Sequence, residues 1–365
     1  MRNGRVRKEG RNKEMFAENK SDRFTAVVPT KNREKDLLRF CEGLAAQTLL
    51  PDKLIIVDQS AEKYRMEGIN LPESVEVEHL YVPEVSGLCA AKNLAVRYAA
   101  GEYIFFFDDD IIPDKDFFEK MIGHFSANPE IFGICGRQKN SVSSRFKVFF
   151  FDFFHVGPFK DERKKFNSGY MKNNLTKTEI LPGGITAYRR EVFENFRFDE
   201  VLIRYCLGED MDFSYRVGKQ YSLAFAADAT ALHNHSPVGR YDAEESFACK
   251  VAGYAYFYGK NVEKTFRNAL AYFWVKAGIF FDACAYSAKH RNLHAFRGLK
   301  RGGKYLKDDF RGVPFIDYEK YRKKKEISEE GKIPKTKSKE MPNVKERGGK
   351  RKYQNSKETP RAKNE

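Results

Sequence analysis

Three consecutive aspartates, Asp108, Asp109 and Asp110, end the apolar segment "YIFFFDDD". Neighbouring carboxylates repel one another, and each loses hydration where the chain leaves a protein core. A divalent cation bound to phosphate groups would neutralise such a cluster, since carboxylate oxygens are preferred ligands of hard cations. In the alternative interpretation Asp110 caps the next helix, although one acid is enough for that and Asp114 is better placed. The triplet therefore favours a metal site that serves phosphate chemistry.

A second acidic group lies in "GEDMDFSYRV", which contains Glu209, Asp210 and Asp212. A carboxylate that faces an attacking hydroxyl can serve as the general base for its proton. In the alternative interpretation Asp210 and Asp212 are surface acids, and Asp212 pairs with Arg216 at i,i+4. That pair would still leave Asp210 on a different face of the helix, where it could act as a base.

The elements that must position these acids alternate between strands and helices from Phe24 onward. The predicted strands are "FTAVVPT", "DKLIIVDQS", "VEVEHLYVP" and "EYIFFFDDD", and the predicted helices are "REKDLLRFCEGLAAQT" and "GLCAAKNLAVRYAAG". Continuous apolar strands separated by helices are typical of a parallel sheet covered on both faces. Ligands of such sheets bind at the carboxyl ends of the strands. Because Asp58 and the aspartate triplet end two strands, we expect them to face one crevice.

Taken in order, these segments resemble the family 2 glycosyltransferases, which have the GT-A fold. The matching segments are "VVPTKNR", "IIVDQS", "GLCAAKN", "DDD", "LPGGITAYRREVF", "GEDMDFSYRV" and "ALHNHS". The resemblance covers about residues 24–240 and implies a Rossmann-like α/β fold, with a mixed, mostly parallel sheet and helices on both faces. It also implies an enzyme that moves a sugar from a nucleoside-diphosphate sugar to a hydroxyl acceptor, with inversion by direct displacement.

On the donor side the resemblance assigns roles to individual residues. Those expected to bind the nucleotide sugar are Pro29, Thr30, Arg33, Asp58, Lys92, Asp108 and Asp109. Asp58 would hydrogen-bond the nucleobase, and Lys92 would lie near the diphosphate at the start of a helix. Asp108 and Asp110 correspond to the two acids of the D-x-D motif, and Asp109 could share either role. The expected donor is a UDP- or dTDP-sugar.

On the acceptor side the resemblance makes Asp210 the catalytic base. The residues expected beside the acceptor are Gly183, Gly184 and Glu209. The two glycines would permit a close approach of the substrate, or they could simply form a turn. The acceptor classes that remain open are a polysaccharide, such as one of the cell envelope, a lipid-linked sugar and a protein glycan.

The expected cofactor is Mg²⁺ or Mn²⁺. Its ligands, again by resemblance, would be Asp110 and His233, with His235 as the alternative to His233. The chemistry supports such an ion independently, because the nucleoside diphosphate gains negative charge as it leaves and a Lewis acid stabilises that charge. Oxygen ligands with a single imidazole suit Mn²⁺ in particular.

The net charge of +15 is concentrated at the two ends of the chain. Residues 1–23 hold eight Lys or Arg against four Asp or Glu, and residues 321–365 hold sixteen against seven. The part between them is close to neutral, so the sequence indicates no basic groove for nucleic acid. We expect residues 1–23 and 316–365 to be disordered tails, with an anionic membrane surface as the functional alternative.

The six cysteines are scattered and form no C-x-x-C pair, which argues against a zinc site or a disulfide framework. The first 23 residues are too polar to contain a secretory signal. Both features suit a reducing compartment. We therefore expect a cytoplasmic protein that could bind peripherally to the cytoplasmic face of a membrane.

Residues 241–315 are predicted to form aromatic helices beyond the α/β domain. The stretch from Asn268 to Tyr286 is mainly apolar, but Lys276 and Asp282 would be costly at the centre of a bilayer. Flanking cations suit a helix in the interface of an anionic membrane, and packing against the α/β domain is the alternative. The run "VFFFDFFHV" and Trp274 are most simply core residues, or otherwise an aromatic patch beside a sugar or lipid acceptor.

Two other functions compete with sugar transfer. A nucleotidyltransferase with a GT-A-like fold would typically open with a glycine-rich loop, which "VVPTKNR" lacks. A nucleic-acid-binding protein that uses its basic tails would have no need for Asp58, the aspartate triplet or Asp210. The carboxylates therefore favour the glycosyltransferase.

Overall fold

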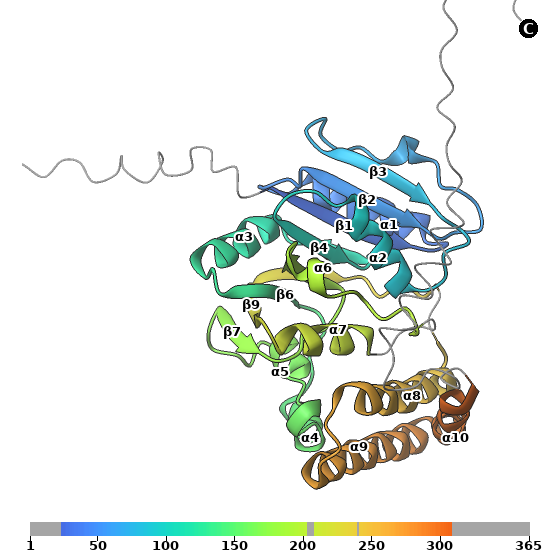
Figure 1. The fold of residues 1–365 in the computed structure, drawn as a ribbon. Coiled ribbons are helices and arrows are strands. Elements are labelled where there is room, and N and C mark those ends of the chain that lie inside the picture. The colour runs from blue at the N-terminus through green and yellow to red at the C-terminus, as the bar shows by residue number, and fades with distance from the viewer. Residues whose placement is uncertain (1–22, 203–207, 239–240, 309–365) are drawn as a thin grey trace, which may run out of the picture. The chain divides into compact units, whose positions relative to one another are not determined.

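The computed structural model describes residues 23–202, 208–238 and 241–308 (Figure 1). The predicted tails, residues 1–23 and 316–365, lie outside the described residues except for Arg23, and so do residues 309–315 of the predicted helical region. Cys206 also lies outside them, and the other five cysteines are free thiols.

Within the described residues nine strands form one sheet, in the order β3-β2-β1-β4-β8-β6-β9-β5, with β7 paired to β9. The strands are β1 (Phe24–Thr30), β2 (Lys53–Asp58), β3 (Glu76–Tyr81), β4 (Tyr103–Phe107), β5 (Ile111–Pro113), β6 (Ile131–Gln138), β7 (Leu175–Thr178), β8 (Ile185–Arg189) and β9 (Ser222–His233). The helices are α1 (Glu34–Ala45), α2 (Leu88–Tyr98), α3 (Phe117–Ala127), α4 (Arg145–Phe154), α5 (Arg163–Asn167), α6 (Val192–Asn195), α7 (Glu209–Gly218), α8 (Ala243–Asn261), α9 (Phe266–His290) and α10 (His294–Asp308). Two 3₁₀ turns, η1 (Met66–Gly68) and η2 (Gly157–Phe159), complete the described elements.

The four predicted strands form the parallel part of the sheet. Strand β1 pairs in parallel with β2 and β4, and β2 pairs in parallel with β3. Thr30 lies opposite Asp58 at the ends of β1 and β2. Because parallel strands end at the same edge of a sheet, Asp58 and Asp108 share that edge. The predicted α/β fold is confirmed.

The rest of the sheet is mixed. Strand β8 is antiparallel to β4 and β6, while β9 is parallel to β6 and antiparallel to β5 and β7. In the pairing of β5 with β9, Ile111 lies opposite His233. Since Asp110 directly precedes β5, this register brings His233 to the aspartate triplet.

Phenylalanine rings fill the core on which β4 lies. All five residues of β4 are buried. Phe105 and Phe107 both pack edge-on against Phe118 of α3, with ring centroids 5.0 and 5.6 Å apart. The segment can therefore be strongly apolar up to Phe107 and acidic from Asp108, because the chain leaves the core between these two residues.

The helices α8, α9 and α10 belong to the same compact unit as the sheet (Figure 1). The ammonium group of Lys260 in α8 contacts the buried carboxylates of Asp199 and Asp212. The hydroxyl of Tyr256, also in α8, donates to Asp199 at 2.6 Å. These contacts attach the helical region to the α/β part. Among the described residues, no helix has the length and apolar character that crossing a membrane requires.

The prediction that the aromatic run "VFFFDFFHV" belongs to the core is wrong for most of α4. Phe146, Phe149 and Phe153 are 74%, 67% and 48% exposed, and only Val148 and Phe154 of this helix are buried. The spacing i, i+3, i+7 places the three exposed rings on one face of the helix. The sequence does not reveal which face of α4 is exposed, because the residues on both faces of this helix are apolar.

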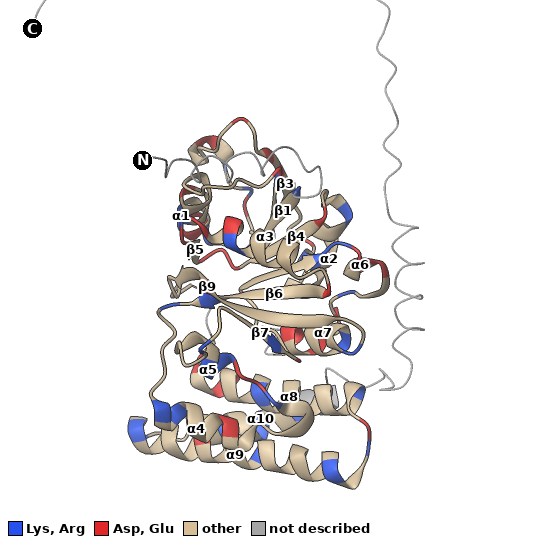
Figure 2. Cartoon of the chain, turned by 90° about the vertical axis from the view of Figure 1, so that its left-hand side faces the viewer, with Lys and Arg blue, Asp and Glu red and all other residues tan. Residues whose placement is uncertain are grey.

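Helix α9 carries a second exposed apolar stripe. Its exposed large side chains are Phe266, Leu270, Phe273, Phe280 and Phe281. Helices α4 and α9 lie side by side, and both are mostly free of charged residues in Figure 2. Trp274 of α9 joins them, because its indole N–H donates to the carbonyl of Phe153 at 2.8 Å. Trp274 is thus half-buried between two helices rather than in a core.

Two expectations about helix ends are not met. The helix predicted from "GLCAAKNLAVRYAAG" ends at Tyr98 and is followed by Ala99 in an extended conformation, so Gly101, with a φ of 83°, lies beyond its end and does not close it. Asp114, predicted as the better cap of α3, does not cap it through its side chain. Its carboxylate instead binds Lys139 and the hydroxyl of Thr230, and Asp116 precedes the helix.

Candidate active site

The three aspartates of the triplet have different partners. These partners offset the repulsion between their neighbouring carboxylates. Asp109 turns back toward β1, where it accepts hydrogen bonds from the Thr30 hydroxyl at 2.8 Å and the Arg33 guanidinium at 2.9 Å. Burial raises the pKa of Asp109 to about 6, although these two partners lower it. Asp109 therefore holds the predicted nucleotide-pocket residues Thr30 and Arg33 in place. Pro29 precedes them at the end of β1.

Asp108 and Asp110 turn toward His233. One ligand atom from each of these three residues lies within 4.8 Å of the others. Burial raises the pKa of Asp108, the Lys92 charge lowers it, and the charges of Asp110 and Asp210 raise it, with a net increase. For Asp110 burial also raises the pKa, but the bonds to His233 and to the Ser236 N–H outweigh it and lower the pKa to about 2.

The imidazole of His233 is oriented from both sides. Its Nε2 lies 3.1 Å from Oδ1 of Asp110, and its Nδ1 lies 3.2 Å from Oε1 of Gln138. The backbone of His233 is held by the side chain of Asn140, which donates to its carbonyl and accepts from its N–H. His235, the alternative ligand in the sequence, packs its ring against that of His233 with centroids 4.1 Å apart. It is not part of the three-residue group.

Asp58 is completely buried at the end of β2. Its carboxylate accepts from the N–H groups of Ser60 and Tyr64, and Nε2 of His79 lies 3.1 Å away. The Tyr64 hydroxyl in turn accepts from the N–H of Arg33. Tyr64 and Arg33 thus connect Asp58 with Asp109 of the aspartate triplet through hydrogen bonds. A carboxylate has about four acceptor positions, so three donors leave one open.

The two glycines between Leu181 and β8 separate the candidate metal ligands from the candidate base. A Cβ atom on Gly183 would lie 1.7 Å from Oδ2 of Asp210. A Cβ atom on Gly184 would lie 2.9 Å from Oδ2 of Asp108, and this residue has a φ of 93°. Only glycine at these positions therefore lets the carboxylates of Asp210 and Asp108 lie so close to this segment.

Asp210 stands in the first turn of α7, where it meets Lys92 of α2. The Lys92 ammonium lies 3.0 Å from Oδ1 of Asp210 and 3.6 Å from Oε1 of Glu209. Burial lowers the pKa of Lys92, but the charges of Asp210, Glu209 and Asp108 raise it by more. Lys92, predicted beside the diphosphate, thus lies between the two acids of the acceptor side.

Asp212 lies on a different face of α7 from Asp210, as predicted. Its carboxylate receives the guanidinium of Arg216 at 2.7 Å, which confirms the i,i+4 pair. The prediction that it is a surface acid is wrong, since Asp212 is only 1% exposed. It also binds the ammonium of Lys260 and the amide of Asn261 in α8. Burial raises the pKa of Asp212, but Lys260, Arg216 and Asn261 outweigh it and lower the pKa below its ordinary value.

Comparison with known proteins shows which family the chain resembles. Residues 25–197 match the family model described as glycosyl transferase family 2. The O-antigen chain rhamnosyltransferase RfbN of Salmonella typhimurium is 25% identical over 234 residues, which cover 62% of this chain and 70% of that protein. Residues 25–197 therefore form a glycosyl transferase family 2 region of this chain. A further relative of this glycosyltransferase is the uncharacterized glycosyltransferase YwdF of Bacillus subtilis, 25% identical over 220 residues, 60% of this chain and 76% of that one.

Solved structures show that the family 2 glycosyltransferase has the GT-A fold. The structure of S. aureus TarS 1-349 in complex with UDP-GlcNAc superposes with a TM-score of 0.50 and 16% identity. The match covers 85% of this chain and 92% of that fragment. Against the longer TarS chain the matched part is 41% of its length, with a TM-score of 0.43. The likeness establishes the fold, and the site must be argued from its own residues.

The donor set of this glycosyltransferase fits a divalent cation. Asp108 and Asp110 offer hard oxygen ligands and His233 a borderline nitrogen, a combination that suits Mn²⁺ or Mg²⁺ better than a soft metal. The contact between Gln138 and Nδ1 of His233 is the kind of second contact that orients a metal-bound imidazole. Asp110 and His233, the predicted ligand pair, thus lie close to each other, and Asp108 belongs to the same group.

Sequence reasoning missed several residues of the site in this glycosyltransferase. Gln138 ends β6 at the same edge as Asp108, so a search for polar residues at strand ends would have found it. His79, Tyr64 and Asn140 carry no such signal, because their roles depend on contacts with segments distant along the chain.

Proposed function

We propose that the enzyme transfers a sugar from a nucleoside-diphosphate sugar to a hydroxyl acceptor by metal-assisted direct displacement, with inversion. The observation that carries the proposal is the position of Gly183 and Gly184. Asp210 lies against the first of these glycines and Asp108, a member of the group that could hold a metal, against the second. A metal-bound diphosphate and a base that activates the acceptor must both lie beside the transferred sugar, because the acceptor attacks as the diphosphate leaves.

On the donor side, Asp58 would recognise the nucleobase through its remaining acceptor position. Thr30 and Arg33, both held by Asp109, would line the nucleotide pocket. Asp108, Asp110 and His233 would hold Mg²⁺ or Mn²⁺, which would stabilise the charge of the departing diphosphate. The donor proposed from the resemblance is a UDP- or dTDP-sugar.

On the acceptor side, Asp210 would accept the proton of the attacking hydroxyl. Glu209, beside it in α7, would orient the acceptor. Lys92 lies between these carboxylates and balances their charge, which lets two acids stand in one partly buried site. A saccharide acceptor is supported by the relative RfbN, named as an O-antigen chain rhamnosyltransferase. A lipid-linked sugar or a polysaccharide fits the same chemistry.

Peripheral association with an anionic membrane is a further part of the proposal. The exposed phenylalanines of α4 and α9 form two adjacent stripes, and soluble proteins rarely leave such a patch open. Exposed cations at the ends of these helices, including Lys147 and Lys289, suit anionic headgroups. The corresponding site in the cell would be the cytoplasmic face of the membrane.

A panel of nucleotide sugars, assayed for hydrolysis with and without added Mn²⁺ and Mg²⁺, tests the core of this proposal. We expect one donor to be hydrolysed only when a divalent ion is present. Asp110→Ala should lower that rate by orders of magnitude. Asp116→Ala, which removes a surface acid paired with Lys120, is the matched control and should retain the rate. Full activity of Asp110→Ala in the presence of a chelator would refute the metal assignment.

A further inference from the structure

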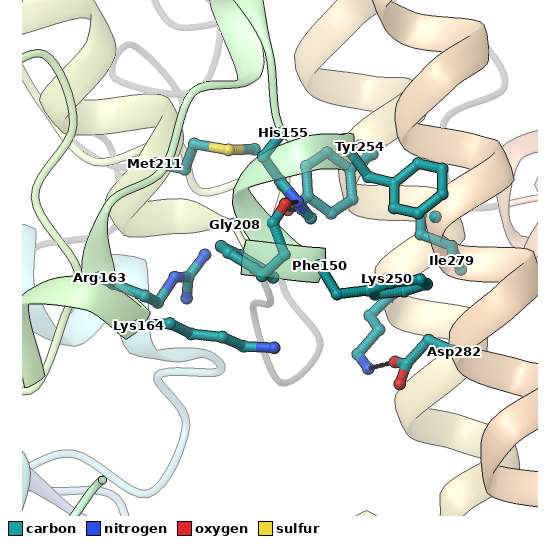
Figure 3. Close-up of a pocket in the computed structure, with 13 residues that line it drawn as sticks. Phe150, His155, Arg163, Lys164, Gly208, Met211, Lys250, Tyr254, Ile279 and Asp282 are labelled. Carbon is teal, nitrogen blue, oxygen red and sulfur yellow. Dashed lines mark hydrogen bonds and ion pairs between the residues drawn. The ribbon is translucent and has the colours of Figure 1, made fainter. Parts of the chain in front are cut away.

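A cavity of about 250 Å³ lies between α4, α5, α8 and α9, beside Gly208, the residue that precedes α7 (Figure 3). Three cations line it, namely Arg163 and Lys164 from α5 and Lys250 from α8. In Figure 3 the two residues of α5 extend toward the helix that carries Lys250. Asp282 and His155 also line it, and the rest of the wall is largely apolar and aromatic. The cavity therefore combines positive charge with a hydrocarbon-like surface.

The positive charge of this cavity is only partly balanced. Arg163 pairs with Asp161, and Lys250 pairs with Asp282 at 2.9 Å. Among the described residues no carboxylate lies within ion-pair distance of Lys164, whose ammonium sits 4.2 Å from the centre of the Phe151 ring. Burial lowers the pKa of Lys164, and the neighbouring cations Lys250 and Arg163 lower it further, whereas Asp282 raises it. A bound anion would supply the missing charge.

The cavity lies on the acceptor side of the candidate base. Gly208 and Met211 line it, and they flank Glu209 and Asp210 in the chain. Burial lowers the pKa of Arg163, but the charges of Asp161 and Tyr254 and, to a smaller extent, that of Asp210 raise it by more. A group held in the cavity would thus lie near the place where the acceptor hydroxyl must stand.

The apolar wall of the cavity leads to the protein surface. Phe150 lines the cavity and is itself 37% exposed, next to the exposed rings of Phe149 and Phe153 on α4. Phe154 and Ile279 complete a path of apolar side chains between α4 and α9. A hydrocarbon chain that leaves the cavity along this path would remain on apolar surface throughout.

We propose that this cavity binds the phosphate ester of an acceptor that carries a hydrocarbon chain. The phosphate contacts Lys164, Arg163 and Lys250, and the chain follows Phe150 toward the exposed stripes of α4 and α9. This inference rests on the proposed function, because it assigns the acceptor class of the same transfer site. It selects a lipid-linked sugar, whose sugar supplies the hydroxyl and whose phosphate ester joins it to the hydrocarbon chain, among the acceptor classes left open above.

Trp274 provides the readout that tests the proposal. It is the only tryptophan of the chain, and its ring lies 5.2 Å from that of Phe154 in the cavity wall. The full-length protein, without donor or metal, is titrated with decyl phosphate, decyl maltoside and inorganic phosphate below any micelle concentration. Decyl phosphate should bind more tightly than either of the others, because only it has both the anion and the chain.

Three variants separate phosphate recognition from nonspecific apolar binding. Lys164→Met should weaken decyl phosphate binding about 10-fold or more, since it removes a charge-assisted contact. Lys172→Met, the same change at an exposed lysine outside the cavity, should bind as the wild type does. Lys164→Arg should retain most of the affinity, and circular dichroism verifies that every variant is folded. Unchanged binding by Lys164→Met, or equal binding of decyl maltoside or inorganic phosphate, overturns the proposal.

A second experiment tests whether the cavity binds a single acceptor molecule or the headgroups of the membrane lipids. Lys164→Met should sediment with phosphatidylglycerol vesicles as the wild type does, because the cavity takes a single extracted molecule. Parallel loss of vesicle binding and decyl phosphate binding would assign the cavity to bulk headgroups and overturn the acceptor. The titration involves no transfer, so an absence of sugar transfer contradicts the proposed function alone. Metal-dependent transfer without decyl phosphate binding contradicts this inference alone.

Discussion

The ammonium group of Lys92 lies 3.0 Å from the Asp210 carboxylate, although the two residues are 118 positions apart in the chain. The contact is largely buried and is shared with Glu209. It joins α2, which belongs to the donor half of the sheet, to the first turn of α7 on the acceptor side. The charge of the candidate base is therefore tied to the nucleotide-binding half of the enzyme.

Replacing Asp210 by Asn should abolish transfer while donor binding persists. An amide cannot accept the proton of the acceptor hydroxyl, and general-base contributions are typically about 10²–10⁴-fold in rate. Calorimetry with the nucleotide sugar and an assay of product formation measure the two effects separately. Glu209→Gln should be milder if it orients the acceptor. Transfer at the wild-type rate, or complete loss of donor binding, would show that Asp210 is not the base.

Replacing Gly183 by Ala should mimic the loss of Asp210. The new methyl group would stand 1.7 Å from Oδ2 of Asp210, so the carboxylate must move. We expect transfer to fall by at least 10-fold, because a displacement of about 1 Å at a reacting group can cost 10²-fold. Gly123→Ala, in α3 with nothing within 4 Å of the added atom, is the control and should transfer normally. Normal transfer by Gly183→Ala would mean that Asp210 needs no fixed position.

Replacing Asp212 by Asn should reduce stability strongly rather than act mildly. From the sequence this variant is expected to be mild, because Asp212 appears paired only to Arg216. The structure adds Lys260 and Asn261 to its partners. Removing one partner of a buried ion pair typically costs about 3–5 kcal/mol, since cations are left unpaired. Urea unfolding measures the loss, and Asp116→Asn at the surface should cost about 1 kcal/mol or less. Equal small losses in both variants would contradict the buried network.

His155 should make the protein less stable as the pH falls from about 6.5 to about 4. Burial lowers its pKa from 6.5 to about 4, even though a bond to the Phe151 carbonyl opposes this. The unfolded chain then binds more protons than the folded one within this window, so stability is present above pH 6.5 and is lost as the pH decreases. At about 1.4 kcal/mol per unit the effect amounts to about 3 kcal/mol.

His155→Gln tests this pH dependence, because glutamine can still bond to Tyr254 and does not titrate. Urea unfolding of both proteins at pH 7 and pH 4.5 gives the comparison. The difference between the two pH values should shrink by about 2–3 kcal/mol in the variant. The same pH dependence in both proteins would assign the effect to other groups.

Replacing Phe149 by Glu should weaken binding to anionic vesicles. Phe149 is 67% exposed on α4 and does not line the cavity, so the change should leave the fold intact. Wild-type protein should sediment with phosphatidylglycerol vesicles and be partly released by high salt, because salt screens the cations but not the apolar contact. The affinity of the variant for the vesicles should be at least about 10-fold lower, as expected for one lost aromatic anchor.

Tyr98→Glu, at an exposed aromatic residue of α2 far from α4 in the chain, is the matched control and should bind as the wild type does. Two results would contradict the membrane proposal. One is vesicle binding that ignores the charge of the lipids, and the other is unchanged binding by the Phe149 variant.

The sequence by itself determined the four strands of the parallel part of the sheet and the positions of the acids at the ends of two of them. A buried parallel strand must be apolar along its length and can be polar only where it leaves the core, so "YIFFFDDD" and "LIIVD" are legible without a partner. The family resemblance then supplied the order of the motifs. Together the strand pattern and the resemblance were sufficient to predict the fold and to place Asp58, Asp108 and Asp110 at the ends of strands.

Only the tertiary structure decided which distant residues meet. The register of β5 against β9 places His233, and not His235, in the group with Asp110, and a register cannot be read from one strand alone. The contact of Lys92 with Asp210 also depends on the tertiary structure, because it joins two helices that are far apart in the chain. The exposure of the α4 phenylalanines was also hidden, because a helix with apolar residues on both faces has no periodicity that marks its outer side. Contacts between segments far apart in the chain are selected by the packing of the whole molecule, which local patterns do not encode.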